Sequence, residues 1–268
     1  MAKQKIERFE VLGKVLFWKE ERALIIGDLH LGFEEVLKEQ GWQIPKVQMK
    51  ETLEDFKIVL DRATDKKKIK LSEIILLGDI KHYFAGVLRA EFRDFGLIRK
   101  LFMEYLEEDG KIIIVKGNHD AIIEPIINVF ENVDLKMFYL KKDVLFVHGD
   151  HKSLNLKLEK ELKNEKLDGR RTWNKIKLIV VGHFHPAITL KDRQKTKQEN
   201  YKCFLYGKSK EFEKNMLVVP SFLPLIAGTD VSQRDSKMES RIQVENFEVF
   251  ALDDEGKMYD FGKVKNLR

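Results

Sequence analysis

The histidines of this chain are concentrated beside acidic and amide side chains. All seven histidines among its 268 residues fall in five short clusters: Asp28-Leu29-His30, Asp79-Ile80-Lys81-His82, Asn118-His119-Asp120, His148-Gly149-Asp150-His151 and His183-Phe184-His185. Carboxylate oxygens, amide oxygens and imidazole nitrogens are donor atoms that borderline divalent ions bind in proteins. Two such ions about 3.5 to 4 Å apart would bind phosphoryl oxygens and hold an activated hydroxide in line with the leaving group. The clusters therefore predict a centre that hydrolyses phosphate esters.

A closed structural zinc site does not fit this composition. Such sites are usually built from several cysteines or from a compact set of cysteines and histidines. The only cysteine of the chain, Cys203, lies outside all five clusters. A single cysteine also excludes a disulfide within the chain. The donor set favours a catalytic centre instead.

Each cluster lies at the end of a short apolar run that can position it. Five runs are rich in aliphatic residues and apolar on both faces: residues 23–26, 74–77, 112–115, 144–147 and 178–181. Such runs are typical of strands buried between two layers. In α/β sheets, binding sites form beyond the carboxyl ends of the strands. The clusters should therefore meet at one edge, and the intervals between them leave room for crossover helices.

Helices and strands are predicted in different parts of the chain. Apolar residues recur at a spacing of three to four in the stretches that we predict to be helices, residues 33–39, 47–63 and 89–107. From residue 186 onward the pattern predicts strands, at residues 186–190, 201–206, 216–219 and 242–252. The C-terminal third is therefore expected to be mostly β. No repeat or Pro/Gly-rich linker divides the sequence, so we predict a single α/β domain over residues 1–268.

The overall composition favours a cytoplasmic protein that does not enter a membrane. Lys and Arg number 49 against 44 Asp and Glu, which leaves a formal net charge of +5. This is a mild bias rather than a basic tail for nucleic acid. The N-terminal segment, residues 1–21, carries charges every few positions and lacks the apolar run of a signal peptide. Apolar runs elsewhere are far shorter than the roughly 18 residues that a membrane span needs.

The order of the motifs resembles that of calcineurin-like metallophosphoesterases. The motifs Asp-x-His, Gly-Asp, Gly117-Asn118-His119-Asp120, a later His-Gly and Gly182-His183-Phe184-His185 follow one another as they do in that family. The resemblance covers residues 27 to 185. It implies an α-β-β-α sandwich of two mixed sheets flanked by helices. It also implies two divalent metal ions, with Mn²⁺ expected first and Zn²⁺, Fe²⁺, Ni²⁺ or Co²⁺ as alternatives.

The resemblance also implies roles for individual residues. One metal ion would be bound by Asp28, His30 and His185. Asp79 would bridge the two ions, and the second ion would be completed by Asn118, His148 and His183. His119 would be the catalytic histidine, which stabilises charge on the phosphoryl group or donates a proton to the leaving alkoxide.

Two further residues of the clusters leave alternatives open. Many family members carry a second aspartate after Gly-Asp that orients the catalytic histidine, whereas this chain has Lys81-His82. His82 is therefore a second catalytic candidate that positions His119 or contacts substrate, and the alternative is a histidine that only packs beside metal ligands. Asp120 is expected to hydrogen-bond an imidazole or to cap the segment that begins at Ala121. It is not expected to bind metal.

The substrate is predicted from the resemblance alone. The small archaeal and bacterial Icc-like phosphoesterases, related to nucleases of double-strand-break repair, resemble this chain most closely. They imply a phosphodiesterase or nuclease that hydrolyses DNA or RNA, with a helicase as a candidate partner. One alternative is a phosphatase or cyclic-nucleotide phosphodiesterase acting on small substrates, and another is a non-catalytic subunit that binds a helicase or DNA. Basic residues between Lys191 and Lys202 form either a phosphate contact or a charged surface loop.

Overall fold

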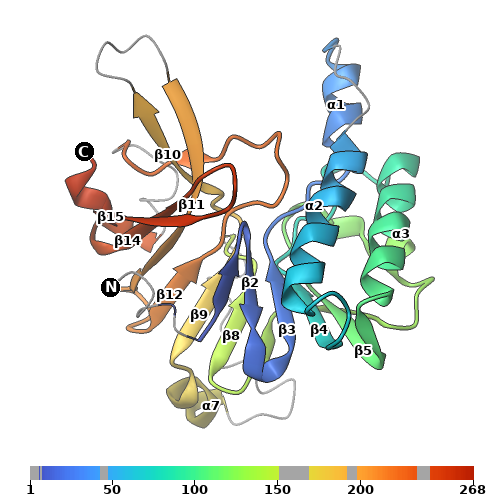
Figure 1. The fold of residues 1–268 in the computed structure, drawn as a ribbon, viewed down its shortest axis with the longest axis horizontal. Helices are drawn as coiled ribbons and strands as arrows, with labels where there is room; N and C mark the ends of the chain where they lie inside the picture. The colour runs from blue at the N-terminus through green and yellow to red at the C-terminus, as the bar shows by residue number, and fades with distance from the viewer. Residues whose placement is uncertain (1–5, 7, 43–47, 151–168, 192–197, 234–241) are drawn as a thin grey trace.

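Two β-sheets packed face to face form the framework of the molecule (Figure 1). The computed structural model describes residues 6, 8–42, 48–150, 169–191, 198–233 and 242–268. In the first sheet the strand order is β1-β2-β3-β4-β5-β6. Its strands are β1 (Glu10–Leu12), β2 (Val15–Trp18), β3 (Ala23–Ile26), β4 (Leu71–Leu76), β5 (Leu106–Val115) and β6 (Val133–Lys136). Strands β3 to β6 are parallel, and β1 and β2 extend the sheet as an antiparallel hairpin.

The second sheet contains the C-terminal half of the chain. Its strand order is β13-β10-β11-β12-β9-β8-β7, and β14 and β15 add to it beside β11. The strands are β7 (Tyr139–Lys141), β8 (Val144–Val147), β9 (Leu178–Val181), β10 (Pro186–Lys191), β11 (Gln198–Lys208), β12 (Asn215–Val218), β13 (Thr229–Asp230), β14 (Glu248–Leu252) and β15 (Met258–Lys263). Strands β8, β9 and β12 are parallel, whereas β11 pairs antiparallel with three neighbours. The predicted β-rich C-terminal third is confirmed.

Helices α2 (Gln48–Ala63), α3 (Arg89–Met103) and α4 (Glu124–Ile127) cover the outer face of the first sheet. Helix α1 (Phe33–Glu39) has no buried residue and projects beyond the end of the sheet, while α7 (Gly169–Lys175) lies beside the second sheet (Figure 1). Four 3₁₀ turns complete the described elements: Lys19–Glu21, His119–Ile122, Val244–Asn246 and Val264–Asn266. Within the described ranges, no helix has the length and apolar character needed to cross a bilayer.

Three apolar layers hold this arrangement together, because burial of aliphatic surface from water is the main favourable term in folding. The middle layer lies between the sheets and contains Ile25 and Ile75 of the first sheet and Phe146 and Leu217 of the second. A second layer packs α2 and α3 on the first sheet, and a third covers the outer face of the second sheet. The runs that are apolar on both faces are therefore buried on both sides, and the predicted sandwich of two mixed sheets is confirmed.

Two predicted elements are several residues shorter in the structure than predicted, and the strand predicted over residues 201–206 is longer, Gln198–Lys208. The helix predicted over residues 89–107 ends at Met103, because Leu106 already pairs with Leu71 as the start of β5. The strand predicted over residues 242–252 begins only at Glu248, after a 3₁₀ turn. The hairpin of β1 and β2 was not predicted, although all four residues of β2 are buried. In residues 89–107 and 242–252 the apolar residues also fit the predicted period. The observed bounds of the elements are set by pairing with neighbouring strands.

The parallel strands end together, which fixes the place of the clusters. In the first sheet Ile26 pairs with Leu76, which pairs with Ile114. In the second sheet Val181 lies in register with both Val147 and Val218. Each cluster begins one to four residues beyond these positions. The carboxyl ends of both sheets therefore bring the clusters to one edge of the sandwich.

Candidate metal centre

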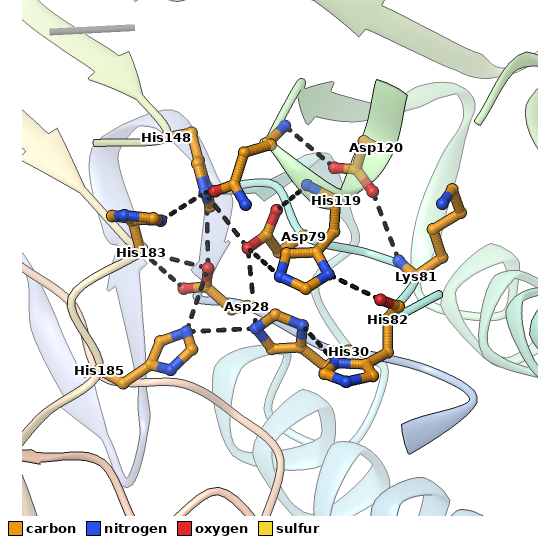
Figure 2. Close-up of polar contacts among 12 residues, drawn as sticks. Asp28, His30, Asp79, Lys81, His82, His119, Asp120, His148, His183 and His185 are labelled. Carbon is orange, nitrogen blue, oxygen red and sulfur yellow. Dashed lines mark hydrogen bonds and ion pairs between the residues drawn. The ribbon is translucent and has the colours of Figure 1, made fainter. Parts of the chain in front are cut away.

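The predicted site residues converge where the two sheets meet (Figure 2). The first sheet supplies Asp28, His30, Asp79, Asn118 and His119, from the loops after β3, β4 and β5. The second sheet supplies His148, His183 and His185, from the loops after β8 and β9. His151 lies outside the described residues. The predicted ligands fall into two groups with Asp79 between them, and His30 also forms a third cluster of possible donors with His82 and His119.

The first group contains Asp28, His30 and His185. His30 Nε2 lies 3.3 Å from His185 Nε2, which lies 3.4 Å from Asp28 Oδ1. The backbone N–H of His183 donates to both carboxylate oxygens of Asp28, at 3.1 and 3.0 Å. Asp28 is fully buried and His30 is 3% exposed. Three donor atoms thus face one small space.

The second group contains Asp79, Asn118, His148 and His183. His148 Nδ1 donates to the carbonyl of Leu77 at 2.7 Å, so in the neutral ring the lone pair is on Nε2. That Nε2 lies 3.1 Å from Asn118 Oδ1 and 3.1 Å from His183 Nδ1. Several acceptor atoms therefore point at one another, which is favourable only when a proton or a metal ion lies between them.

Asp79 lies between the two groups. Its Oδ2 is 3.4 Å from His148 Nε2 and 3.7 Å from His30 Nε2. Its Oδ1 accepts the backbone N–H of His119 at 2.9 Å, which fixes the carboxylate. One oxygen of Asp79 is thus within reach of both groups, as a bridging ligand requires.

The spacing of the donors fits metal binding. With metal–ligand bonds of about 2.1 Å, neighbouring ligands in a tetrahedral or octahedral shell are about 3.0 to 3.4 Å apart. Five separations within the two groups, 3.1 to 3.4 Å, fall in this interval. The residues present therefore fit two divalent ions, and the roles of the individual ligands remain predictions.

Burial sets the protonation of the imidazoles. It lowers the pKa of His30 to about 3 and the pKa of His183 to about 4, so both rings are neutral near pH 7 and able to bind metal. Burial also disfavours a charge on His148, but its contact with Asp79 and the negative charges of Asp79 and Asp28 outweigh this and raise its pKa well above the ordinary value. In the metal-free protein His148 is therefore protonated beside the carboxylates of Asp28 and Asp79.

This charge pattern predicts a proton release on metal binding. The proton on His148 Nε2 has to leave before a metal ion can take its place, whereas His30 and His183 have none to lose. We expect about one proton to be released at pH 7 and metal affinity to rise with pH. Calorimetric titration with Mn²⁺ in buffers of different ionisation enthalpy measures this number. An enthalpy that does not depend on the buffer would contradict the assignment.

The backbone around the site adopts conformations that side chains seldom favour. Asp79, His30, His183 and His185 have φ values of 46°, 43°, 62° and 46°, in the left-handed region. Such conformations cost energy and concentrate at functional sites. Gly117 has to be glycine because of close packing: a Cβ atom there would lie 2.3 Å from Asp79 Oδ1. The loops thus adopt locally unfavourable backbone conformations that bring the predicted ligands together.

His119 lies beside the two groups and is held by His82. His119 Nδ1 donates to the backbone carbonyl of His82 at 2.7 Å, which leaves Nε2 directed toward Asp79 Oδ2, 3.9 Å away. The imidazole of His82 stacks on that of His119, with ring centroids 5.1 Å apart, and also contacts His30, with 3.3 Å between the two Nδ1 atoms. Of the roles predicted for His82, the geometry favours positioning over substrate contact.

Asp120 has a role that neither predicted alternative describes. Its Oδ1 accepts the backbone N–H groups of Ile80 and Lys81, and its Oδ2 accepts that of Gly117. Asp120 is therefore neither an imidazole partner nor a cap of the segment after it in the described contacts. Burial, aided by the charge of Asp79, raises its pKa to about 6. It joins the two loops that carry Asp79 and Asn118.

Glu91 was not predicted, because on the sequence it resembles an ordinary charge on helix α3. It is fully buried, and Oε1 accepts the backbone N–H groups of His82 and Tyr83 at 3.0 and 2.8 Å. Oε2 accepts that of Leu88 at 2.7 Å. The only sequence signal was its position as the third residue of a helical pattern. Glu91 fixes the segment whose carbonyl orients His119.

We expect Glu91→Gln to lower both stability and turnover. Glutamine can still accept from His82 and Tyr83, but its amide N–H₂ then faces the N–H of Leu88. An unpaired buried donor costs about 1 to 3 kcal/mol of unfolding free energy, and His119 loses its fixed orientation. Urea unfolding and the kcat for a phosphodiester measure the two effects, with the exposed Glu51→Gln as the matched control. Unchanged stability would show that the carboxylate contacts are dispensable.

Lys202 does not extend the candidate site. Its ammonium donates to the carbonyls of Ser221 and Leu223 and to the Ser221 hydroxyl, so it supports the segment after β12 instead of facing solvent. Residues 192–197 of the predicted basic segment lie outside the described residues. The described part of the chain therefore leaves that segment untested as a phosphate contact.

Comparisons with known proteins place this geometry in a family. The family model of calcineurin-like phosphoesterases matches residues 21–217. The solved structure of the nuclease MPE of Pseudomonas putida is similar, with a TM-score of 0.54 and 15% identity over 94% of this chain and 100% of that chain. Vps29 of Entamoeba histolytica, as a double mutant, gives a TM-score of 0.32 and 14% identity over 90% and 99% of the two chains. A search of curated proteins found no match.

The chain belongs to the calcineurin-like phosphoesterase family, because the family model covers most of its length. This confirms the family predicted from the order of the motifs. Membership identifies the protein as a phosphoester hydrolase of this fold. At 15% identity, the likeness to the nuclease shows a shared fold and leaves the substrate to be proposed.

Proposed function

We propose that this protein is a phosphodiesterase that uses two divalent metal ions, Mn²⁺ first among them, to cleave single-stranded DNA or RNA. The observation that carries the proposal is the convergence of two donor groups on Asp79 Oδ2, with His119 beside them. Ions bound there would polarise the phosphoryl oxygens and activate the attacking water. The likeness in fold to a nuclease supports a polymeric substrate.

The side chains indicate the side from which a substrate approaches. The side chains of His119 and His185 are 13% and 17% exposed, whereas that of His148 is fully buried. A phosphodiester can therefore reach the centre past His119 and His185. His119 Nε2 is the free nitrogen of its ring, since Nδ1 is committed to the His82 carbonyl. When protonated, it can stabilise phosphoryl charge or donate its proton to the leaving oxygen.

Hydrolysis assays with metal-stripped protein test the proposal. Bis-p-nitrophenyl phosphate and labelled single-stranded DNA are offered with added Mn²⁺, beside a His119→Ala control. Cleavage of both that requires Mn²⁺ and is lost in the control supports the nuclease. Cleavage of the small ester alone favours a small-molecule phosphodiesterase or phosphatase. No activity on either substrate overturns the proposal in favour of a non-catalytic binding subunit.

A further inference from the structure

We propose that Phe84 is a stacking platform for a nucleobase next to the scissile phosphate. The inference rests on the proposed function and adds a substrate class, nucleic acid with an unpaired base at the site. Phe84 lies in the segment between His82 and α3, outside the five clusters. Its ring is the feature that extends the centre from a phosphate site to a nucleotide site.

Phe84 is both exposed and in contact with the reactive histidine. Its ring centroid lies 3.7 Å from that of His119, at an interplanar angle of 35°. The residue is nevertheless 56% exposed. A single exposed aromatic residue is common on protein surfaces. The ring of Phe84 packs against His119 and leaves much of its surface in water, so a flat ligand can stack on it.

The segment that carries Phe84 is fixed on both sides. Glu91 accepts the backbone N–H groups of Tyr83 and Leu88. The buried ammonium of Lys81 donates to the carbonyl of Tyr83. The backbone next to Phe84 is thus held before any ligand arrives. A fixed platform loses little conformational entropy on binding, which favours affinity.

The surroundings point to a base rather than to another apolar group. The rings of His82, His119 and Phe33 form a connected aromatic set beside Phe84, and they lie next to the donor groups whose metal ions would bind the phosphate. Aromatic side chains beside a phosphate contact are the usual arrangement for single-stranded nucleic acid, because every base has a π face. A base in a duplex has both faces covered, so a substrate that stacks here must present an unpaired base.

Paired oligonucleotides with and without bases give the direct test. Binding of fluorescein-labelled oligothymidylate and of an abasic oligonucleotide of equal length and charge is measured by anisotropy in EDTA. The same two substrates are cleaved with Mn²⁺. Phe84→Ala should weaken binding and kcat/KM for the base-containing strand by roughly 5- to 100-fold and leave the abasic strand nearly unchanged. Phe84→Trp should retain the preference, and the exposed Tyr259→Ala on β15 serves as the control.

The outcomes separate this inference from the proposed function. Equal losses on both strands would overturn the platform and show that Phe84 only shields His119 from water. Phe84→Leu keeps apolar bulk without a π face, so full activity of this variant on the base-containing strand would also overturn it. Absence of DNA cleavage and binding in the unmodified protein would instead refute the nuclease itself.

Discussion

Asp79→Asn is expected to lower occupancy at both metal positions and to reduce turnover at least about a thousandfold, since Lewis-acid stabilisation is worth several kcal/mol. The oxygen of Asp79 that faces His30 and His148 loses its charge in this variant. Asparagine keeps the shape and can still accept the N–H of His119, so the fold should persist. Metal content after dialysis and the kcat for bis-p-nitrophenyl phosphate measure the effect.

The number of ions lost distinguishes a bridging residue from an ordinary ligand. His148→Ala removes a donor of the second group only, and we expect it to reduce the metal content by about one ion. The more exposed Asp134→Asn, which breaks a surface ion pair with Lys111, is the matched control. If Asp79→Asn lost no more metal than His148→Ala, Asp79 would belong to one group and the bridging role would be wrong.

His119→Ala should keep its metal content and lose turnover by about 10²- to 10⁴-fold, the usual contribution of a general acid or base. The side chain is not among the predicted ligands around Asp79, although it lies with His30 and His82 in a third cluster of possible donors, and the backbone N–H of His119 holds the Asp79 carboxylate. Alanine preserves this backbone contact. Stopped assays with Mn²⁺, together with metal analysis of the same samples, measure both quantities.

The leaving group shows what His119 contributes. An alkoxide released from DNA needs a proton more than p-nitrophenolate does. If His119 is a general acid, His119→Ala should therefore lose more turnover on DNA than on bis-p-nitrophenyl phosphate. Equal losses on both substrates would favour stabilisation of phosphoryl charge. Loss of metal from this variant would instead make His119 a ligand and would undo the division of roles.

The sequence allowed the convergence of the site to be predicted, because it depends on strand ends. Asp28, Asp79 and His183 follow short apolar runs that are buried on both faces, and parallel strands end at a common edge. Helix α1 and the start of the β-rich third were predicted from the local spacing of their apolar residues. Where helix and strand periods fit equally well, as at Leu106, pairing with a distant strand decided the outcome.

Contacts made through the backbone could not be read from residue types. His82 orients His119 by its carbonyl, and Asp120 and Glu91 accept backbone N–H groups. Any residue offers these backbone groups, so the backbone partner in each contact leaves no pattern in the sequence. The contact between Phe84 and His119 depends likewise on the path of a loop and not on a periodic element.

The division of the donors between two sheets has a consequence for synthesis of the chain. The first sheet is complete at Lys136, when the ribosome has not yet made any strand of the second. A nascent or prematurely terminated chain of that length carries Asp28 and Asp79 without the imidazoles of His148, His183 and His185. No fragment from either half can therefore hold a complete centre. A protein sample that hydrolyses phosphate esters therefore contains chains in which the second sheet has been synthesised and packed against the first.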